Sequence, residues 1–202
     1  LPFGIEGALL DLARISAMVL KTHEDHGVPG AIVASLSIPW GQTRDDTGGY
    51  HLVWARDLVE AAGGLMAVGA AEDARRVLAY LIATQQPDGS WVQNQWLDGR
   101  AYWHGIQLDE VGFPILLADL LREHGALADL NIRPMILRAA QFLARNGPVT
   151  EQDRWEEDRG YSPFTLAVEI AALVCAADLL DEPARTYALE LADTWNSQIE
   201  PW

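Results

Sequence analysis

Two adjacent glutamates, Glu156 and Glu157, follow a tryptophan in the stretch QDRWEEDRGYSPF at residues 152–164. Side chains that are neighbours in sequence point in different directions on a helix or turn, so these two carboxyl groups cannot share one proton, and we expect separate roles for them. An apolar wall formed by Trp155 would raise the pKa of a carboxyl group toward the value that a general acid needs. Solvated charge in an exposed loop is the alternative interpretation, and this stretch alone does not separate the two.

A second cluster, GGYHLVWARDLVEAAGG, places Arg56 and Asp57 at an expected helix start. In one interpretation Asp57 caps the helix and Arg56 forms an ion pair. In the other the cluster binds a sugar, because arginine donors and aspartate acceptors suit hydroxyl groups. The C–H face of the sugar ring would then pack on Tyr50 and Trp54.

A third cluster, QQPDGSWVQNQWLDGRAYWHGIQLDEVGFP, again combines an aromatic ring with amide and carboxylate groups. Trp103 precedes Gln107, Asp109 and Glu110, which lie beside another expected helix start. His104 has no second histidine at ligand spacing, so neither a metal site nor a cofactor is predicted.

Composition narrows the range of partners. The 202 residues include 29 acidic and 14 basic side chains, a net charge of −15, which argues against nucleic acid and anionic membranes as partners because their phosphates would repel the protein. No apolar run approaches the roughly 18–20 residues that a membrane span needs. The chain begins LPFGIEGALL, without the pattern of a signal peptide.

Elements that position these clusters are read from apolar residues recurring at helical spacing. The pattern predicts helices over residues 5–23, 55–70, 71–86, 110–125, 132–147, 162–180 and 182–199. Only residues 30–38 are typical of an extended segment, either a hairpin arm or a loop that lines a cleft. Long tryptophan-rich connections at residues 39–53, 87–103 and 146–161 indicate a cleft at one end of the helices.

The stretches GAIVASLSIPWG, GGYHLVWARDLV, DGSWVQNQWLDG, YWHGIQLDEVGFPILLA and EQDRWEEDRGYSPFTLAVEIAALVCAADLL, in this order, resemble the catalytic domain of the glucoamylases and glucodextranases of glycoside hydrolase family fifteen, the bacterial branch most of all. The resemblance implies an all-α fold, an (α/α)6 toroid of which about seven of twelve helices are expected here. Residues 1–202 would form one partial catalytic domain, without the β-sandwich that precedes the toroid in bacterial members and without its C-terminal part.

By the same resemblance, the protein would remove glucose from the non-reducing ends of α-linked glucans with inversion of configuration. The family's general acid, the first glutamate after the motif tryptophan, falls on Glu156. The substrate-binding positions would be Tyr50, Trp54, Arg56, Asp57, Trp103, Gln107, Asp109, Asp153, Trp155 and Glu157. A secreted or periplasmic location would fit the family, and the choice between α-1,4 and α-1,6 linkages stays open.

Two departures from the family pattern stand out. Phe164 places a ring in YSPFT where bacterial relatives usually have a serine. The family's general base, a glutamate far downstream, has no counterpart before Trp202, so we expect the 202-residue chain to be inactive alone and its bare helix faces to allow self-association.

Two other functions stay open. The stretch QQPDGSW resembles, weakly, the glutamine-tryptophan motif of terpene cyclases, but the aspartate-rich acid motif of those enzymes is missing. The other is a glycan-binding or interaction module that does not cleave its ligand.

Overall fold

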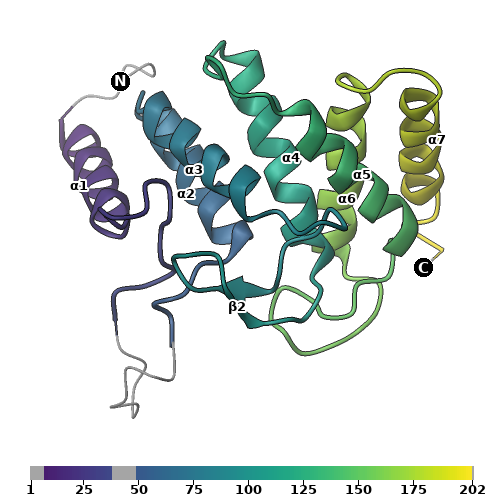
Figure 1. Ribbon diagram of the computed structural model, residues 1–202, viewed down its shortest axis with the longest axis horizontal. Coiled ribbons are helices and arrows are strands. Elements are labelled where there is room, and N and C mark those ends of the chain that lie inside the picture. The colour runs from purple at the N-terminus through teal and green to yellow at the C-terminus, as the bar shows by residue number, and fades with distance from the viewer. Residues whose placement is uncertain (1–6, 38–48, 202) are drawn as a thin grey trace.

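The computed structural model describes residues 7–37 and 49–201, and within them helices predominate (Figure 1). The helices are α1 (Ala8–Thr22), α2 (Ala55–Ala67), α3 (Ala71–Thr84), α4 (Leu108–Glu123), α5 (Arg133–Asn146), α6 (Pro163–Ala177) and α7 (Ala184–Ser197). Each lies within, or within two residues of, a stretch that the hydrophobic periodicity predicted, so the helical expectation is confirmed.

The helices form two layers that alternate along the chain. α4 packs chiefly against α2 and α6, while α3, α5 and α7 each pack on the helix that precedes them. Helices α4 and α6 therefore have neighbours on several sides, and buried residues occur all around α4. The two helices approach closely at Gly112, where a Cβ atom would come within 2.7 Å of the Val168 side chain.

Connections of unequal length separate the two ends of the layers. Short connections lead out of α2, α4 and α6, whereas long ones lead into them, so the N-termini of α2, α4 and α6 share one end with the long loops (lower part of Figure 1). A cleft at this loop end was the expectation from the sequence. Trp40 and most of the predicted connection 39–53 lie outside the described residues.

Two short strands occur within the long loop between α3 and α4, where no strand was predicted. Strands β1 (Asn94–Gln95) and β2 (Ala101–Trp103) form an antiparallel hairpin. The predicted extended segment at 30–38 forms no named strand within the described residues, although the amide of Ala34 bonds to the carbonyl of Leu52 at 3.0 Å. It is the cleft-lining alternative that holds for this segment, since Ala34 lines the cavity described below.

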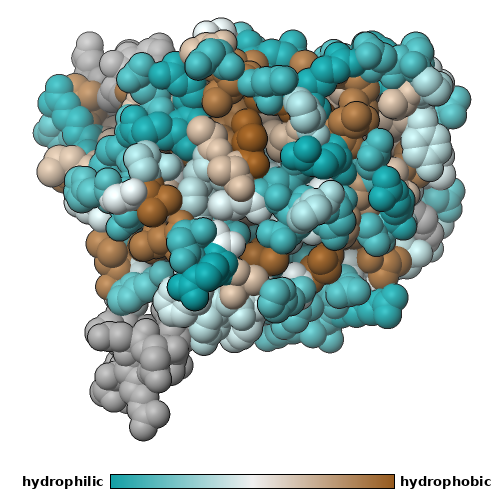
Figure 2. Space-filling model, in the orientation of Figure 1, coloured by the Kyte–Doolittle hydropathy of each residue, from teal (hydrophilic) through white to brown (hydrophobic). Residues whose placement is uncertain are grey.

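Apolar residues reach the surface in several places between hydrophilic ones (Figure 2). The longest such series lies on α1, which has no fully buried residue. Its exposed apolar side chains are Leu9, Leu12, Ile15, Met18 and Val19.

Candidate active site

A cavity of about 690 Å³ opens at the loop end of the helices. Its wall is formed by Ala34, Gly49, Tyr50, Leu52, Trp54, Arg56, Asp57, Asn94, Tyr102, Trp103, Arg154, Trp155 and Glu156. Residues from all three sequence clusters thus meet in one place, although some of them lie more than a hundred positions apart. Most of the predicted site residues are on this wall.

Glu156 is held in the cavity by a long-range hydrogen bond. The indole Nε1 of Trp54, a residue that is only 6% exposed, donates to Glu156 Oε1 at 2.9 Å. The backbone of Glu156 has φ +66°, in the left-handed region that few non-glycine residues adopt. Such conformations persist only where the surroundings enforce them, and they gather at functional sites.

The loop that carries Glu156 is organised around Asp153. The Asp153 carboxylate accepts the amide N–H groups of Trp155 at 2.9 Å and Glu157 at 3.1 Å, and its carbonyl accepts the amide of Glu156 at 2.9 Å. The loop is closed at its base by two backbone hydrogen bonds between Thr150 and Gly160. Asp153 therefore fixes the turn, and it is not on the cavity wall.

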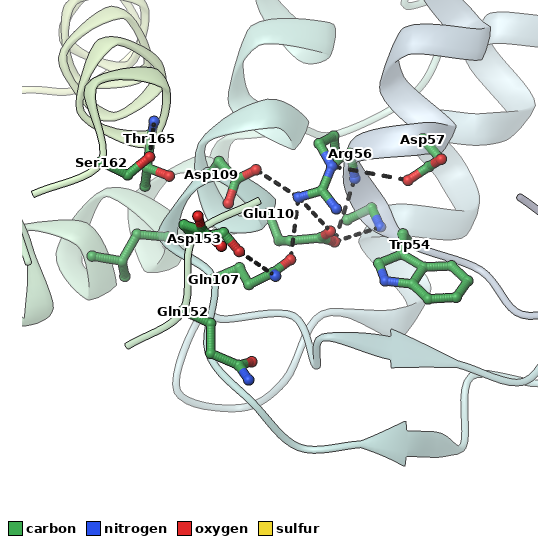
Figure 3. A network of polar contacts seen from close by, with 12 residues as sticks. Trp54, Arg56, Asp57, Gln107, Asp109, Glu110, Gln152, Asp153, Ser162 and Thr165 are labelled. Carbon is green, nitrogen blue, oxygen red and sulfur yellow. Dashed lines mark hydrogen bonds and ion pairs between the residues drawn. The ribbon is translucent and has the colours of Figure 1, made fainter. Parts of the chain in front are cut away.

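Arg56 lies at the centre of a buried polar network (Figure 3). Its Nη1 donates to Asp109 Oδ2 at 2.7 Å and to Gln107 Oε1 at 3.1 Å. Gln107 in turn donates from Nε2 to the carbonyl oxygen of Asp153 at 2.8 Å. One amide side chain thus joins the arginine on α2 to the loop that bears Glu156.

Glu110, which was not among the predicted site residues, caps α2 from the neighbouring helix. Its Oε2 accepts the amide N–H groups of Ala55 at 2.6 Å and Arg56 at 3.3 Å, and its Oε1 lies 3.4 Å from Arg56 Nη1. The N-cap residue of α2 makes no side-chain cap, and the Asp57 carboxylate accepts a hydrogen bond from its own backbone amide, so the capping interpretation of Asp57 stays a prediction. The sequence signal that could have identified Glu110 is its place directly after Asp109, at the start of an apolar helix.

Electrostatics at the site follow from burial and from this crowding of charge. Burial tends to lower the pKa of Arg56, but Glu110 and Asp109 outweigh it and raise that pKa above its ordinary value. Burial raises the pKa of Glu110 well above its usual range, against the opposing effect of Arg56. The pKa of Asp57 is also raised, first by burial, with Glu60 and Glu156 adding to the effect and Arg56 opposing it.

The expectation that Trp155 forms an apolar wall for Glu156 is not met by its position. Its side chain is 69% exposed, and the guanidinium carbon of Arg154 lies 4.8 Å from its ring centroid. The same carbon lies 4.4 Å from the ring centroid of Phe164. Phe164, the departure from the family pattern, therefore packs against an arginine of the cavity wall.

Four predicted site residues lie off the cavity wall. Gln107 and Asp109 are fully buried behind Arg56, and Asp153 holds the turn of the loop. The Glu157 side chain is exposed, and its backbone belongs to the same turn. Glu156 and Glu157 thus occupy different surroundings, as expected for neighbours in sequence.

A second buried glutamate lies behind the site. Glu169 on α6 is fully buried, and neither of its carboxyl oxygens has a hydrogen-bond partner among the described residues. Burial, with a smaller contribution from Asp109, raises the pKa of Glu169 to about 8.

Residues 7–37 and 49–201 contain neither a metal-binding cluster nor a membrane-spanning helix. No group of three or more His, Cys, Asp or Glu side chains there is arranged to hold a metal ion. No helix in these segments has the length and hydropathy that crossing a membrane requires.

Comparison with known proteins identifies the family of this chain. The sequence profile described as glycosyl hydrolases family 15 matches residues 8–88 and 85–202. The chain belongs to glycosyl hydrolase family 15. The terpene-cyclase interpretation is thereby set aside, and Trp91 of the QQPDGSW stretch is a core residue whose indole donates to the Leu81 carbonyl at 3.0 Å.

Several family 15 proteins are similar to this chain. A glucoamylase of Clostridium sp. (strain G0005) is 46% identical over 192 residues, which are 92% of this chain and 26% of that protein. A crystal structure of a bacterial glucoamylase complexed with acarbose superposes with a TM-score of 0.86 at 43% identity, covering 94% of this chain and 28% of the other. A glucoamylase from Saccharomycopsis fibuligera shares the fold, with a TM-score of 0.66 at 17% identity.

The superposition confirms the expected fold, an incomplete part of an (α/α)6 toroid. The chain spans about a quarter of the length of the Clostridium glucoamylase and of the acarbose-bound bacterial glucoamylase.

Proposed function

We propose that the whole protein hydrolyses terminal α-linked glucose from the non-reducing ends of α-glucans, with Glu156 as the general acid. The observation that carries the proposal is the pairing of Glu156 with Trp54 in a cavity that also exposes Arg56 and Asp57. An acid that can protonate a glycosidic oxygen then stands beside groups suited to sugar hydroxyls.

The cavity wall supports a direct substrate contact for most of the predicted residues. Arg56 and Asp57 would bind hydroxyl groups, while the rings on the wall would pack against sugar faces. These rings are Tyr50, Trp54, Trp103 and Trp155. Gln107, Asp109 and Asp153 would act indirectly, by holding Arg56 and the loop of Glu156 in place.

The general base is the part of the mechanism for which we assign no residue in this chain. An inverting glycosidase needs a second carboxylate roughly 6.5–9.5 Å from the acid, on the opposite face of the sugar. Among the described residues of the wall the carboxylates are Asp57 and Glu156, and we assign Asp57 to binding. We propose that the base belongs to the rest of the whole protein, since this chain spans 28% of a similar glucoamylase structure.

Replacing Glu156 by Gln in the whole protein tests the assignment. The amide keeps an oxygen for the Trp54 N–H group but cannot protonate the leaving oxygen, so we expect kcat to fall by roughly 10²–10⁴-fold. Glucose release from maltooligosaccharides would be followed by proton NMR, which also reports whether the β-anomer forms first.

Glu151→Gln is the matched control, because Glu151 is an exposed glutamate of the same loop that does not line the cavity. Its kcat is expected to equal that of the wild type. Retention of most activity by the Glu156→Gln protein would contradict the role of Glu156. Tight binding of maltooligosaccharides without any glucose release by the wild type would instead favour a glycan-binding module.

Self-association remains a separate proposal for the apolar series on α1. Light scattering coupled to size exclusion would contradict it by finding only monomers of the whole protein.

A further inference from the structure

The β1–β2 hairpin brings a side chain to the cavity that the sequence did not identify. Asn94 on β1 pairs with Trp103 on β2, and both residues line the cavity. Trp103 is half-exposed there, whereas Asn94 has no exposed surface at all. A fully buried polar residue in the wall of a sugar-sized cavity needs an account of its hydrogen bonds.

One half of the Asn94 amide is accounted for. Its Oδ1 accepts the backbone N–H of Trp103 at 3.1 Å. Since only the oxygen can accept from an N–H group, this bond fixes which end of the amide faces the hairpin and which end faces away.

The other half has no partner. The Nδ2 of Asn94 is buried and makes no hydrogen bond within the described part of the chain. A buried donor that lacks an acceptor is unfavourable, and Asn94 is one of the residues that line the cavity, so an acceptor that arrives with a ligand would satisfy it.

The neighbouring amide on the same strand differs in its donor. Gln95 is about equally buried and its Oε1 also lacks a partner among the described residues, but its Nε2 donates to the Tyr80 hydroxyl at 3.0 Å, and Gln95 does not line the cavity. The ladder is irregular between these two residues, and their contacts differ: Asn94 lines the cavity, whereas Gln95 bonds to Tyr80 of the core.

The chemistry of the wall narrows the class of ligand. A neutral amide N–H suits a neutral oxygen acceptor, and the ring of Trp103, with Asp57 and Glu156 elsewhere on the wall, suits a sugar more than an anion. We infer that Asn94 is a substrate-binding residue that donates from Nδ2 to one hydroxyl oxygen of the bound α-glucan. The inference rests on the proposed function, which it extends by one specific contact.

A cycle between protein variants and monodeoxy maltosides tests the inference. Each maltoside lacks one hydroxyl group, and kcat/KM is measured for the whole wild-type protein and for Asn94→Leu. The wild type is expected to lose on the order of tenfold to a hundredfold on the one analogue that lacks the contacted hydroxyl. The Asn94→Leu protein should show a much smaller loss on that analogue, because its contact is already absent.

Asn94→Ser provides a second variant if leucine disturbs the hairpin, and the same analogue should lose its effect there. Gln95→Met is the control, since it removes an equally buried amide that faces the core. This variant is expected to keep the wild-type pattern across the analogues, whatever its unfolding temperature.

An unchanged pattern in both Asn94 variants would overturn the inference while leaving the glucosidase proposal intact. Failure of the wild-type protein to act on or bind maltose would overturn the proposed function itself, and the inference with it. The two failures are therefore distinguishable.

Discussion

Glu110 on α4 and Glu169 on α6 are both fully buried glutamates, and their helices pack against each other. Their surroundings nevertheless differ completely. Glu110 accepts two backbone amides at the start of α2 and lies 3.4 Å from Arg56. Glu169 has no hydrogen-bond partner within the described residues. Burial raises the pKa of both carboxyl groups, but only at Glu110 do neighbouring groups oppose that effect.

The difference in partners corresponds to a difference in role between the two glutamates. Glu110 belongs to a network that fixes Arg56, and through Gln107 the loop of Glu156, so its burial serves the geometry of the cavity. Glu169, with a pKa of about 8, is protonated at neutral pH and needs no counter-charge. The two carboxyl groups are thus buried to the same extent and differ in their partners.

The largest effect on this comparison is expected from replacing Arg56. This arginine is the cation beside Glu110, and Glu169 has no such partner among the described residues. In Arg56→Ala, Asp109 and Glu110 stay buried without their cation, so we expect the free energy of unfolding to fall by about 3–5 kcal/mol. Urea unfolding followed by circular dichroism measures the change.

Arg75→Ala on α3 is the matched control. Arg75 pairs with Glu72, whose side chain is 79% exposed, and an exposed ion pair contributes less than about 1 kcal/mol. Equal decreases in the free energy of unfolding of the two variants would mean that the buried network around Arg56 stabilises the protein no more than an exposed ion pair does.

Glu169→Gln should sharpen the comparison through pH. The pKa of Glu169 is about 8 in the folded protein and near its usual value when unfolded, so the folded state holds the extra proton between these values. The contribution of Glu169 to the free energy of unfolding is therefore largest at low pH. It decreases as pH rises, by about 2–3 kcal/mol from pH 5 to pH 7. Replacement by Gln removes that fall.

Unfolding free energies at several pH values between 5 and 9 measure the slope for both proteins. The exposed Glu190→Gln variant should keep the wild-type slope. If Glu169→Gln does the same, Glu169 has a partner and the contrast with Glu110 disappears.

Gln107→Leu is expected to have the smallest effect on stability, about 1–2 kcal/mol, because it removes hydrogen bonds rather than a charge. It also releases the loop of Glu156 from Arg56, so kcat should fall more than KM rises. Separate measurement of kcat and KM in the whole protein checks this. A Gln141→Ala protein, changed on the exposed face of α5, should match the wild type in both constants.

Sequence alone was sufficient for the helices, because each of them carries apolar residues at three- and four-residue spacing. The family resemblance also predicted seven of the described residues that line the cavity, Arg56 and Glu156 among them. It did not assign Gln107 and Asp109 to positions behind Arg56, since burial at a helix start depends on what packs over it. Nor did it identify Trp54 as the partner of Glu156, a contact across 102 positions.

The hairpin at Asn94 was missed for a local reason. Its arms are too short and too mixed in hydropathy to alternate clearly, as strands usually do. The Asp98-Gly99 pair between them is a strong hairpin signal and could have indicated the turn.

The left-handed backbone at position 156 is unfavourable for a glutamate, although the proposed reaction needs a glutamate there. Glycine or asparagine would relax that backbone, so substitutions chosen for stability alone would favour them at this position. Either would delete the carboxyl group to which we assign proton donation. Position 156 is therefore a point where thermostability engineering and turnover oppose each other, and consensus-style optimisation of this loop should leave that one residue fixed.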